Sequence, residues 1–248
     1  MDIIKALNID ITKKHFISIV GAGGKTTLLY YLSRKFRDMN RKILLTTTTH
    51  IYMPTENIFD SSLISDDKDN IIKYAGSIDR SGVYLVGSSI DEESKLKGLD
   101  SDALDKLSRL NVFDLILVEA DGSKNKPIKA PTEREPVVPE STTIMIGVIG
   151  LDSLGRFVDS GTVHRLEEFC CICECSKEDV IDEAMIAKLI SHPRGLFKNV
   201  PDKAEKIVFL NKVDDIELRN SGIKIKSMIE EDRVKFVMSS MKNDMCWM

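Results

Sequence analysis

The 248-residue sequence has no long hydrophobic run and no surplus of positive charge. No segment approaches the ~20 apolar residues that a membrane-spanning helix needs. Residues 1–14 lack the basic start and the long apolar core of a signal peptide. A net charge of -4 gives no excess of positive charge that would attract nucleic acid or an anionic membrane. We therefore expect a cytoplasmic protein that binds neither nucleic acid nor a membrane.

Paired C-x-x-C knuckles are also absent, although the sequence contains five cysteines. Four of them lie close together, at Cys170, Cys171, Cys173 and Cys175. In a reducing cytosol such a cluster is not a disulfide framework, and its spacing is not that of a zinc site. Partly buried thiols are the simpler interpretation, and a role in handling a metal or selenium is the alternative.

A glycine-rich stretch near the N-terminus carries the strongest functional signal. Residues 15–20 are a short apolar run rich in β-branched side chains, which predicts a strand. The strand is followed by the loop residues Gly21, Ala22, Gly23, Gly24, Lys25, Thr26 and Thr27, and then by helical periodicity. Glycines let a backbone wrap phosphates closely, and N–H groups at a helix N-terminus point at the anion. We expect this loop to bind GTP or ATP, with Lys25 on the outer phosphates and the Thr26 hydroxyl on Mg²⁺.

The loop is shorter than the usual phosphate loop. The spacing G-x-x-x-x-G-K-[ST] would place a glycine at Ile19, whereas this sequence has G-x-x-G-K-T. The shorter loop is known in Mur-type ligases, so an ATP-dependent ligase or kinase that acts on a small anionic substrate is an alternative function. The chain is too short for the three domains of a Mur ligase. A glycine-rich turn that binds nothing is a further alternative.

The remaining pattern alternates strands with helices. It predicts strands at residues 15–20, 42–48, 82–87, 113–118, 143–149, 206–210 and 234–238, and helices at residues 2–7, 26–39, 102–110, 163–192 and 216–230. Such alternation predicts an α/β fold of the P-loop NTPase type, a mostly parallel sheet with helices on both faces. We expect one domain over residues 1–248, with a helical insertion at about residues 152–200. Ligands of such sheets bind beyond the carboxyl ends of the strands.

Two acidic residues follow the predicted strand at 113–118, within the motif V-E-A-D-G-S. In phosphate-loop nucleotidases an acidic residue at this point holds Mg²⁺, directly or through water. Glu119 and Asp121 are therefore candidate metal ligands, and with Lys25 they are candidate catalytic residues. The sequence does not choose between the two, and an acidic turn of the D-G kind is the alternative.

Residues Asn211, Lys212 and Asp214 form an N-K-x-D pattern directly after the predicted strand at 206–210. The pattern resembles the guanine-reading element of GTP-binding proteins, whose carboxylate accepts hydrogen bonds from the purine ring N–H and amino group. Adenine has an amino group where guanine has a carbonyl, so the pattern favours GTP over ATP. An exposed helix cap built on Asp214 or Asp215 is the alternative.

Four threonines and His50 follow one another at residues 46–50, at the end of the second predicted strand. Hydroxyl groups and an imidazole at the carboxyl edge of a sheet can position water, metal or substrate. His50 is therefore a further candidate catalytic residue. Threonine is also simply a good strand former.

Taken in order, these motifs make the chain resemble the YqeC family, described as accessory proteins of selenium-dependent molybdenum hydroxylases. The resemblance runs nearly end to end. It is carried by V-G-A-G-G-K-T-T at 20–27, T-T-T-T-H at 46–50, V-E-A-D-G-S at 118–123, P-I-K-A-P at 127–131, E-P-V-V-P at 135–139, G-L-D at 150–152, V-H-R at 163–165, G-L-F-K at 195–198 and N-K-V-D at 211–214. The cysteine cluster is not part of this pattern.

The resemblance implies a nucleotide-dependent step in the maturation of a selenium-dependent molybdenum hydroxylase or its cofactor. The loop and acidic motif also look like those of metallochaperone GTPases, an analogy at the level of fold. Six cations are candidates for holding an anionic substrate such as a pterin phosphate or selenophosphate: Lys124, Lys126, Lys129, Arg134, Arg165 and Lys198. We expect a Mg²⁺-dependent NTPase that prefers GTP. The alternatives are the ligase or kinase above and a non-catalytic, nucleotide-gated delivery protein.

Overall fold

The computed structural model describes residues 2–230, 234–243 and 245–247, and a large sheet forms its centre. The strands of this sheet are β1 (His15–Gly21), β2 (Lys42–Thr47), β4 (Ser61–Ile64), β5 (Gly82–Gly87), β8 (Leu115–Glu119), β10 (Ile144–Gly150), β12 (Glu205–Asn211), β13 (Val234–Ser240) and β14 (Met245–Trp247). Within the described residues their order is β14-β13-β12-β10-β1-β8-β2-β5-β4. Each neighbouring pair is parallel except β13 and β14.

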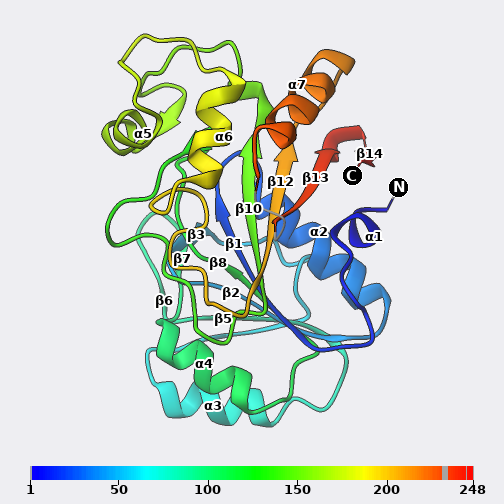
Figure 1. Cartoon of the computed structure of the whole chain (residues 1–248). Coiled ribbons are helices and arrows are strands. Elements are labelled where there is room, and N and C mark those ends of the chain that lie inside the picture. The colour runs from blue at the N-terminus through cyan, green and yellow to red at the C-terminus, as the bar shows by residue number, and fades with distance from the viewer. Residues whose placement is uncertain (1, 231–233, 244, 248) are drawn as a thin grey trace.

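Helices cover both faces of the sheet (Figure 1). One face packs on α1 (Ile3–Leu7) and α2 (Lys25–Asp38). The other face packs on α3 (Lys68–Gly76), α4 (Ser101–Arg109), α5 (Leu166–Cys173), α6 (Glu183–Ser191) and α7 (Ile216–Ser227). The predicted α/β, P-loop NTPase-like fold is therefore confirmed.

Strand β1 shows why the sheet is buried on both sides. Ile17 and Ile19 pack in the apolar cluster that contains α1 and α2, whereas Phe16 and Val20 pack in the cluster on the opposite face. Successive side chains of a strand point to opposite faces, so a strand that is apolar at nearly every position must be covered on both. The apolar run at residues 15–20 thus becomes a central strand.

The chain order brings several strand ends to one edge. From β1 the chain passes through α2 to β2, which lies on one side of β1 with β8 between them, whereas β10 and β12 lie on the other side. Because these strands are parallel, the residues that follow β1, β2, β8, β10 and β12 gather at the same edge. All the candidate motifs of the sequence except the cysteines follow one of these strands.

Two smaller sheets lie beside that edge. One consists of β3 (His50–Tyr52), β7 (Lys95–Lys97) and β6 (Ser89–Ile90), in that order, and the other pairs β9 (Ile128–Lys129) with β11 (Val163–His164). Two short 3-10 helices follow strand ends, η1 (Leu151–Ser153) after β10 and η2 (Met241–Asn243) after β13. None of these short elements is predicted by the sequence pattern.

The predicted helix at residues 163–192 is wrong in its middle. Two helices, α5 and α6, are separated there by residues 174–182. Glu174 has a left-handed backbone (φ 54°) and ends α5, while the Asp182 side chain accepts a hydrogen bond from Met185 N–H and begins α6. Asp67 caps α3 in the same way, by accepting hydrogen bonds from the N–H groups of Asp69 and Asn70.

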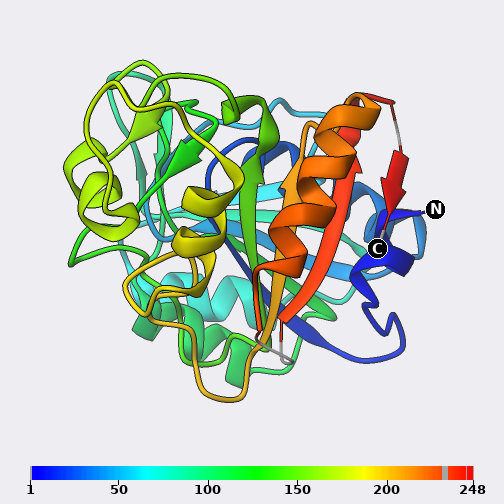
Figure 2. The same ribbon diagram turned by 45° about the horizontal axis from the view of Figure 1, so that its top comes forward.

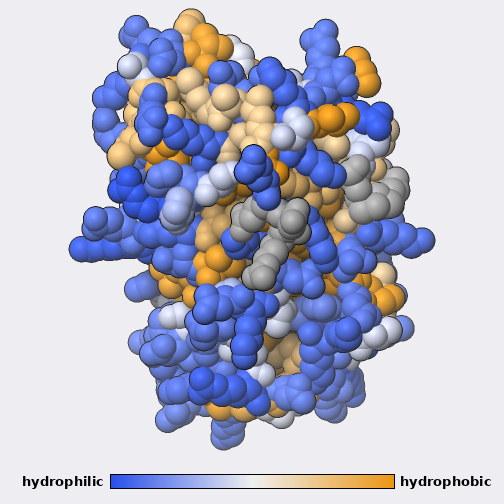
Figure 3. Space-filling view, in the orientation of Figure 1, coloured by the Kyte–Doolittle hydropathy of each residue, from blue (hydrophilic) through white to orange (hydrophobic). Residues whose placement is uncertain are grey.

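The described ends of the chain lie together, since α1 contacts β13 and β14 (Figure 2). In Figure 3 more hydrophobic side chains gather over α5 and α6 than over α3 and α4. Across the described residues, no helix has the length and apolar character needed to cross a membrane.

Candidate functional site

The glycine loop between β1 and α2 has a backbone that glycine adopts readily and other residues rarely do. Gly21, Gly23 and Gly24 all have positive φ values, of 89°, 86° and 130°. A Cβ on Gly23 would also overlap the backbone nitrogen of Gly150 at the end of β10. Both the conformation and the close approach require glycine, so the loop geometry follows directly from the sequence.

The N-terminus of α2 presents free backbone donors. Gly24 occupies the cap position and supplies no side-chain hydrogen bond. Within the part of the chain that the structure describes, the N–H groups of residues 24–27 have no hydrogen-bond partner. Unpaired N–H groups and the positive end of the helix dipole make such a terminus a binding site for anions.

Lys25 is buried inside this loop and faces two carboxylates. Its Nζ donates a hydrogen bond to Gly21 O at 2.8 Å and lies 3.1 Å from Asp121 Oδ1 and 3.5 Å from Glu119 Oε1. Burial alone would lower the pKa of Lys25, but the charges of Asp121 and Glu119 outweigh burial and raise that pKa. Lys25 is therefore a permanent cation.

Thr26 and Glu119 form a second contact at the start of α2. The Thr26 hydroxyl donates a hydrogen bond to Glu119 Oε2 over 2.7 Å. Glu119 is 5% exposed, and burial raises its pKa although Lys25 and Thr26 oppose the shift. The structure thus brings Lys25 and Thr26 of the glycine loop together with Glu119 of the acidic motif, as the sequence predicts. The role of Thr26 and Glu119 as metal ligands stays a prediction.

Asp121 belongs to a chain of ion pairs that is buried at Lys129 and reaches the surface at Arg165. Its Oδ2 lies 3.1 Å from Lys129 Nζ and accepts a hydrogen bond from Gly21 N–H. Lys129 in turn lies 3.0 Å from Glu135 Oε2, and Glu135 Oε1 lies 3.3 Å from Arg165. With Lys25 and Glu119 this chain holds three cations and three anions, so its formal charge sums to zero.

Glu135 is the member of this chain that sequence reasoning missed. Burial would raise the pKa of Glu135, but Lys129 and Arg165 outweigh burial and lower it. The motif E-P-V-V-P that contains Glu135 resembles the family pattern, which was the available signal. Nothing in the sequence pairs it with Lys129.

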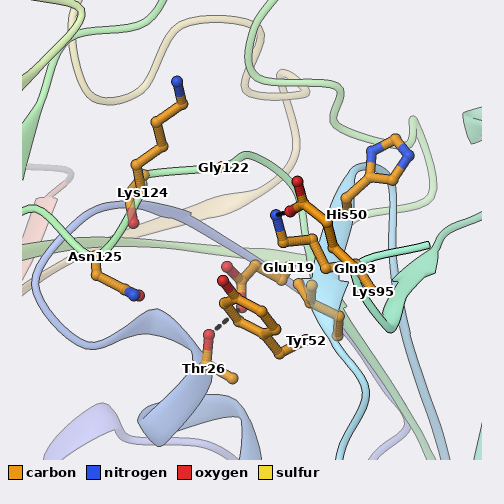
Figure 4. A pocket seen from close by; sticks show the side chains of 11 residues that line it. Thr26, His50, Tyr52, Glu93, Lys95, Glu119, Gly122, Lys124 and Asn125 are labelled. Atoms are coloured by element: carbon orange, nitrogen blue, oxygen red, sulfur yellow. Dashed lines mark hydrogen bonds and ion pairs between the residues drawn. The ribbon is translucent and has the colours of Figure 1, made fainter. Parts of the chain in front are cut away.

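A cavity of about 610 Å³ opens beside Thr26 and Glu119 (Figure 4). Its lining residues are Thr26, His50, Ile51, Tyr52, Glu93, Lys95, Glu119, Gly122, Ser123, Lys124 and Asn125. In the view of Figure 4, Lys124 and Asn125 lie on one side of Glu119, and His50 and Lys95 on the other. His50 is exposed at the start of β3 and lines the cavity, and its catalytic role stays a prediction.

The threonines that precede His50 are mostly bound to the backbone. The hydroxyl groups of Thr46, Thr47 and Thr48 donate to the carbonyl oxygens of Val86, Glu119 and Val137. They tie β2 to neighbouring segments. Their frequency in the motif is therefore explained by the fold.

A second pocket, of about 330 Å³, lies on the other side of the loop. Gly24, Thr27, Asn211, Lys212, Asp214, Met241 and Lys242 line it. The N-K-x-D residues thus meet the phosphate loop in space, and Asn211 Nδ2 donates to Gly23 O at 2.8 Å. Asp214 accepts a hydrogen bond from the Ser240 hydroxyl at 2.5 Å, and Lys212 Nζ lies 2.9 Å from Asp152 Oδ2.

The helix-cap alternative is confirmed for Asp215, which caps α7, but not for Asp214. The Asp215 side chain accepts a hydrogen bond from Leu218 N–H. Asp214 is exposed at the pocket instead.

Five of the six candidate anion-binding cations do not face the large cavity. Lys129 and Arg165 belong to the ion chain, while Lys126 donates to Gly161 O and Lys198 to carbonyl groups at residues 132, 133 and 135. Arg134 is exposed elsewhere. Lys124 alone among the six lines the cavity.

The clustered cysteines are free thiols around α5. Cys173 is buried, Cys170 and Cys175 are half-buried and Cys171 is exposed. Burial raises the pKa of Cys173, and both burial and Cys170 raise that of Cys175 to about 11. A raised pKa keeps the thiols of Cys173 and Cys175 protonated, which makes these two side chains less reactive. In the residues that the structure describes, no three His, Cys, Asp or Glu side chains are grouped so as to hold a metal ion.

Two comparisons with known proteins, one with family models and one with curated sequences, give the same family. A family model described as "YqeC protein" matches residues 17–167, which include the loop, Glu119 and Asp121. Over 204 residues the chain is 35% identical to "Uncharacterized protein YqeC" of Escherichia coli (strain K12), an alignment that covers 81% of this chain and 77% of that protein. No solved structure matches the chain. The chain belongs to the YqeC protein family.

Proposed function

We propose that this protein is a Mg²⁺-dependent NTPase that prefers GTP and assists the maturation of a selenium-dependent molybdenum hydroxylase. One observation carries the nucleotide part of the proposal. The unpaired N–H groups at the start of α2 lie between two pockets, with Asp214 in one and Glu119 in the other. A nucleotide whose base meets Asp214 and whose phosphates meet residues 24–27 directs its terminal phosphate toward Thr26 and Glu119.

The residues at the loop fit Mg²⁺ and a phosphate chain. The glycines give the loop a positive-φ backbone that other residues rarely adopt, and the Thr26 hydroxyl and Glu119 carboxylate would supply oxygen ligands. Mg²⁺ is usually held by one or two protein oxygens together with phosphates and water, rather than by a protein cage. When bound, Mg²⁺ would neutralise charge on the phosphates. Lys25 and the loop N–H groups would stabilise the transferred phosphoryl group, and His50 would orient the attacking water.

The base preference is supported by the pocket at the N-K-x-D residues. The Ser240 hydroxyl donates a hydrogen bond to one carboxylate oxygen of Asp214, and Asp214 lines the pocket. A carboxylate that only accepts hydrogen bonds matches the ring N–H and amino group of guanine. The Lys212 side chain is fixed at the edge of the same pocket by Asp152.

The proposed partner is a selenium-dependent molybdenum hydroxylase or its cofactor. Its sole support is the description of the family that the chain resembles, and the E. coli relative is described only as uncharacterized. The nucleotide and partner parts are therefore tested separately.

A direct test measures nucleotide binding and hydrolysis with purified protein. We expect fluorescent GTP to bind more tightly than fluorescent ATP in the presence of Mg²⁺, and phosphate release to require Mg²⁺. The partner part is tested by co-purification with the hydroxylase in the presence and absence of nucleotide. Absence of Mg²⁺-dependent phosphate release, with the hydroxylase present, would contradict the NTPase assignment. Nucleotide-dependent co-purification without turnover would instead support the delivery alternative.

A further inference from the structure

The cavity beside Thr26 and Glu119 is much larger than hydrolysis requires. Its volume is about 610 Å³, whereas a water molecule takes up about 30 Å³ in the liquid. Sites for small molecules have volumes of about 300–1,000 Å³. The terminal phosphate and Mg²⁺ would fill the part of the cavity at Thr26 and Glu119, and the part beside His50, Tyr52 and Lys124 is left for a small second substrate.

One wall of the cavity is a fixed part of the fold. The small sheet of β3, β7 and β6 contributes His50, Tyr52 and Lys95. This sheet is pressed against the end of β2, where Gly98 N–H donates to Thr49 O and a Cβ on Gly98 would overlap the Thr47 carbonyl. Such a wall keeps its shape when a ligand enters, as preformed binding sites do.

The charges of the cavity leave one cation without a partner. Lys95 forms an ion pair with Glu93 and lies 5.1 Å from the centre of the Tyr52 ring, so its charge is compensated. Lys124 makes no ion pair and no hydrogen bond within the described ranges. Lys124 and Asn125 both have left-handed backbones, with φ values of 47° and 58°. Lys124 therefore stands at the rim of the cavity, with its ammonium group extending away from Glu119 in the view of Figure 4.

We propose that this cavity binds a small oxyanion as second substrate and that the oxyanion accepts the terminal phosphoryl group of the nucleotide. The proposal rests on the proposed function, because a nucleotide at the loop must first bring its terminal phosphate to Thr26 and Glu119 at the edge of the cavity. Lys124 attracts the negative charge of the acceptor, and Lys25 with the N–H groups of residues 24–27 offsets the charge of the phosphates. His50 and Tyr52 provide the remaining polar and aromatic contacts.

The transfer balances without a general base. A lone pair of the anionic acceptor oxygen forms a bond to the terminal phosphorus, while the bond from that phosphorus to the β–γ bridging oxygen breaks. The electron pair of that bond stays on the nucleoside diphosphate. Because the acceptor oxygen is already deprotonated, no proton is released. The products are a nucleoside diphosphate and a phosphorylated oxyanion.

The test uses inorganic phosphate as the probe oxyanion. The protein is first saturated with Mg²⁺ and a non-hydrolysable imido analogue of GTP, which fills the terminal phosphate position. Binding of radioactive phosphate is then measured by equilibrium dialysis. We expect one phosphate to bind per chain. Lys124→Glu should weaken this binding at least tenfold, because attraction becomes repulsion. The matched control is Lys126→Glu in the same loop, whose ammonium is bound to Gly161 O, and it should change phosphate binding less than threefold.

The outcomes separate the two proposals. Failure of the imido analogue to bind contradicts the proposed function, and the transfer step with it. Normal binding of the analogue without bound phosphate contradicts only the second-substrate site. Equal weakening by Lys124→Glu and Lys126→Glu also contradicts that site, because it would show a general effect of surface charge.

Discussion

The Thr26 hydroxyl donates a hydrogen bond to Glu119 Oε2 over 2.7 Å, and so joins the phosphate loop to the end of β8. Asp121, only two residues further along, instead faces Lys25 and Lys129. The sequence leaves the choice of metal ligand between Glu119 and Asp121 open. The contact with Thr26 favours Glu119 as the residue that holds Mg²⁺, with Asp121 as the partner of the two lysines.

The first prediction separates these two acidic residues. In Glu119→Gln we expect the Mg²⁺ concentration for half-maximal GTP binding to rise at least tenfold, because Mg²⁺ prefers charged oxygen ligands to amides. Asp121→Asn should shift that concentration less than threefold. Both are measured by titrating Mg²⁺ with fluorescent GTP present. A larger shift in Asp121→Asn would reverse the assignment.

The second prediction concerns Lys25. Lys25→Ala should weaken binding of Mg²⁺-GTP at least a hundredfold, equivalent to about 2.7 kcal/mol, because it removes the cation that pairs with the outer phosphates. It also leaves Glu119 and Asp121 without Lys25, so thermal unfolding is measured to confirm that the variant folds. Lys35→Ala, on the same helix but at its exposed far end, is the matched control. Unchanged binding in a folded Lys25→Ala protein would exclude this loop as the nucleotide site.

The third prediction addresses the base. Asp214→Asn should weaken GTP binding by about 10- to 100-fold, since hydrogen bonds to a charged group contribute roughly 1.5–3 kcal/mol, and should leave ATP binding nearly unchanged. Asp215→Asn is the matched control, because asparagine also caps a helix. Competition between GTP and ATP against a fluorescent nucleotide gives both affinities. If the protein prefers ATP and Asp214→Asn keeps that preference, guanine recognition is wrong.

The fourth prediction tests the close approach of the glycine loop at Gly23 to the end of β10 at Gly150. Gly23→Ala should lower the free energy of unfolding by more than the ~1–2 kcal/mol of a left-handed alanine, because its Cβ would overlap the backbone of Gly150. Gly122→Ala, which meets its nearest atom at 3.8 Å, should have a small effect. Chemical denaturation measures both. A Gly23→Ala protein as stable as the wild type would contradict this packing.

The fifth prediction is a pH dependence that comes from His164. Burial and the neighbouring cations Lys129 and Arg165 lower the pKa of His164 from 6.5 to about 4. As the pH falls through this window, the unfolded chain takes up a proton that the folded chain does not, so the free energy of unfolding decreases. His164→Gln should show a smaller decrease between pH 6.5 and pH 4, and chemical denaturation at several pH values measures it. Identical pH profiles would show that His164 titrates normally.

Much of the fold is predictable because local signals and burial agree. The apolar runs at 15–20, 113–118, 143–149 and 206–210 all become strands of the central sheet. The motifs that follow three of these runs then meet at one edge, since parallel strands place their carboxyl ends together. The loop, Glu119 and Asn211 are therefore close in space, as their positions in the sequence predict.

The remaining features depend on contacts between distant segments. The small sheet at the cavity pairs residues 50–52 with residues 95–97, and such short strands have no periodicity to detect. Likewise, the pairing of Lys129 with Asp121 and Glu135 depends on how the long segment after β8 folds back. Residues 174–182 were predicted as helix because apolar spacing continues into α6, but a left-handed Glu174 interrupts it.

The neutral chain of ion pairs would make phosphate binding at Lys25 an exchange rather than an addition. A phosphate that binds Lys25 would have to draw its ammonium group away from Asp121 and Glu119, so the proposed affinity would reflect the difference between two sets of ionic contacts. When that phosphate dissociates, the same carboxylates would be in place to pair with the lysine again. In the proposed function, the two carboxylates would therefore compete with the product for Lys25 and favour its release.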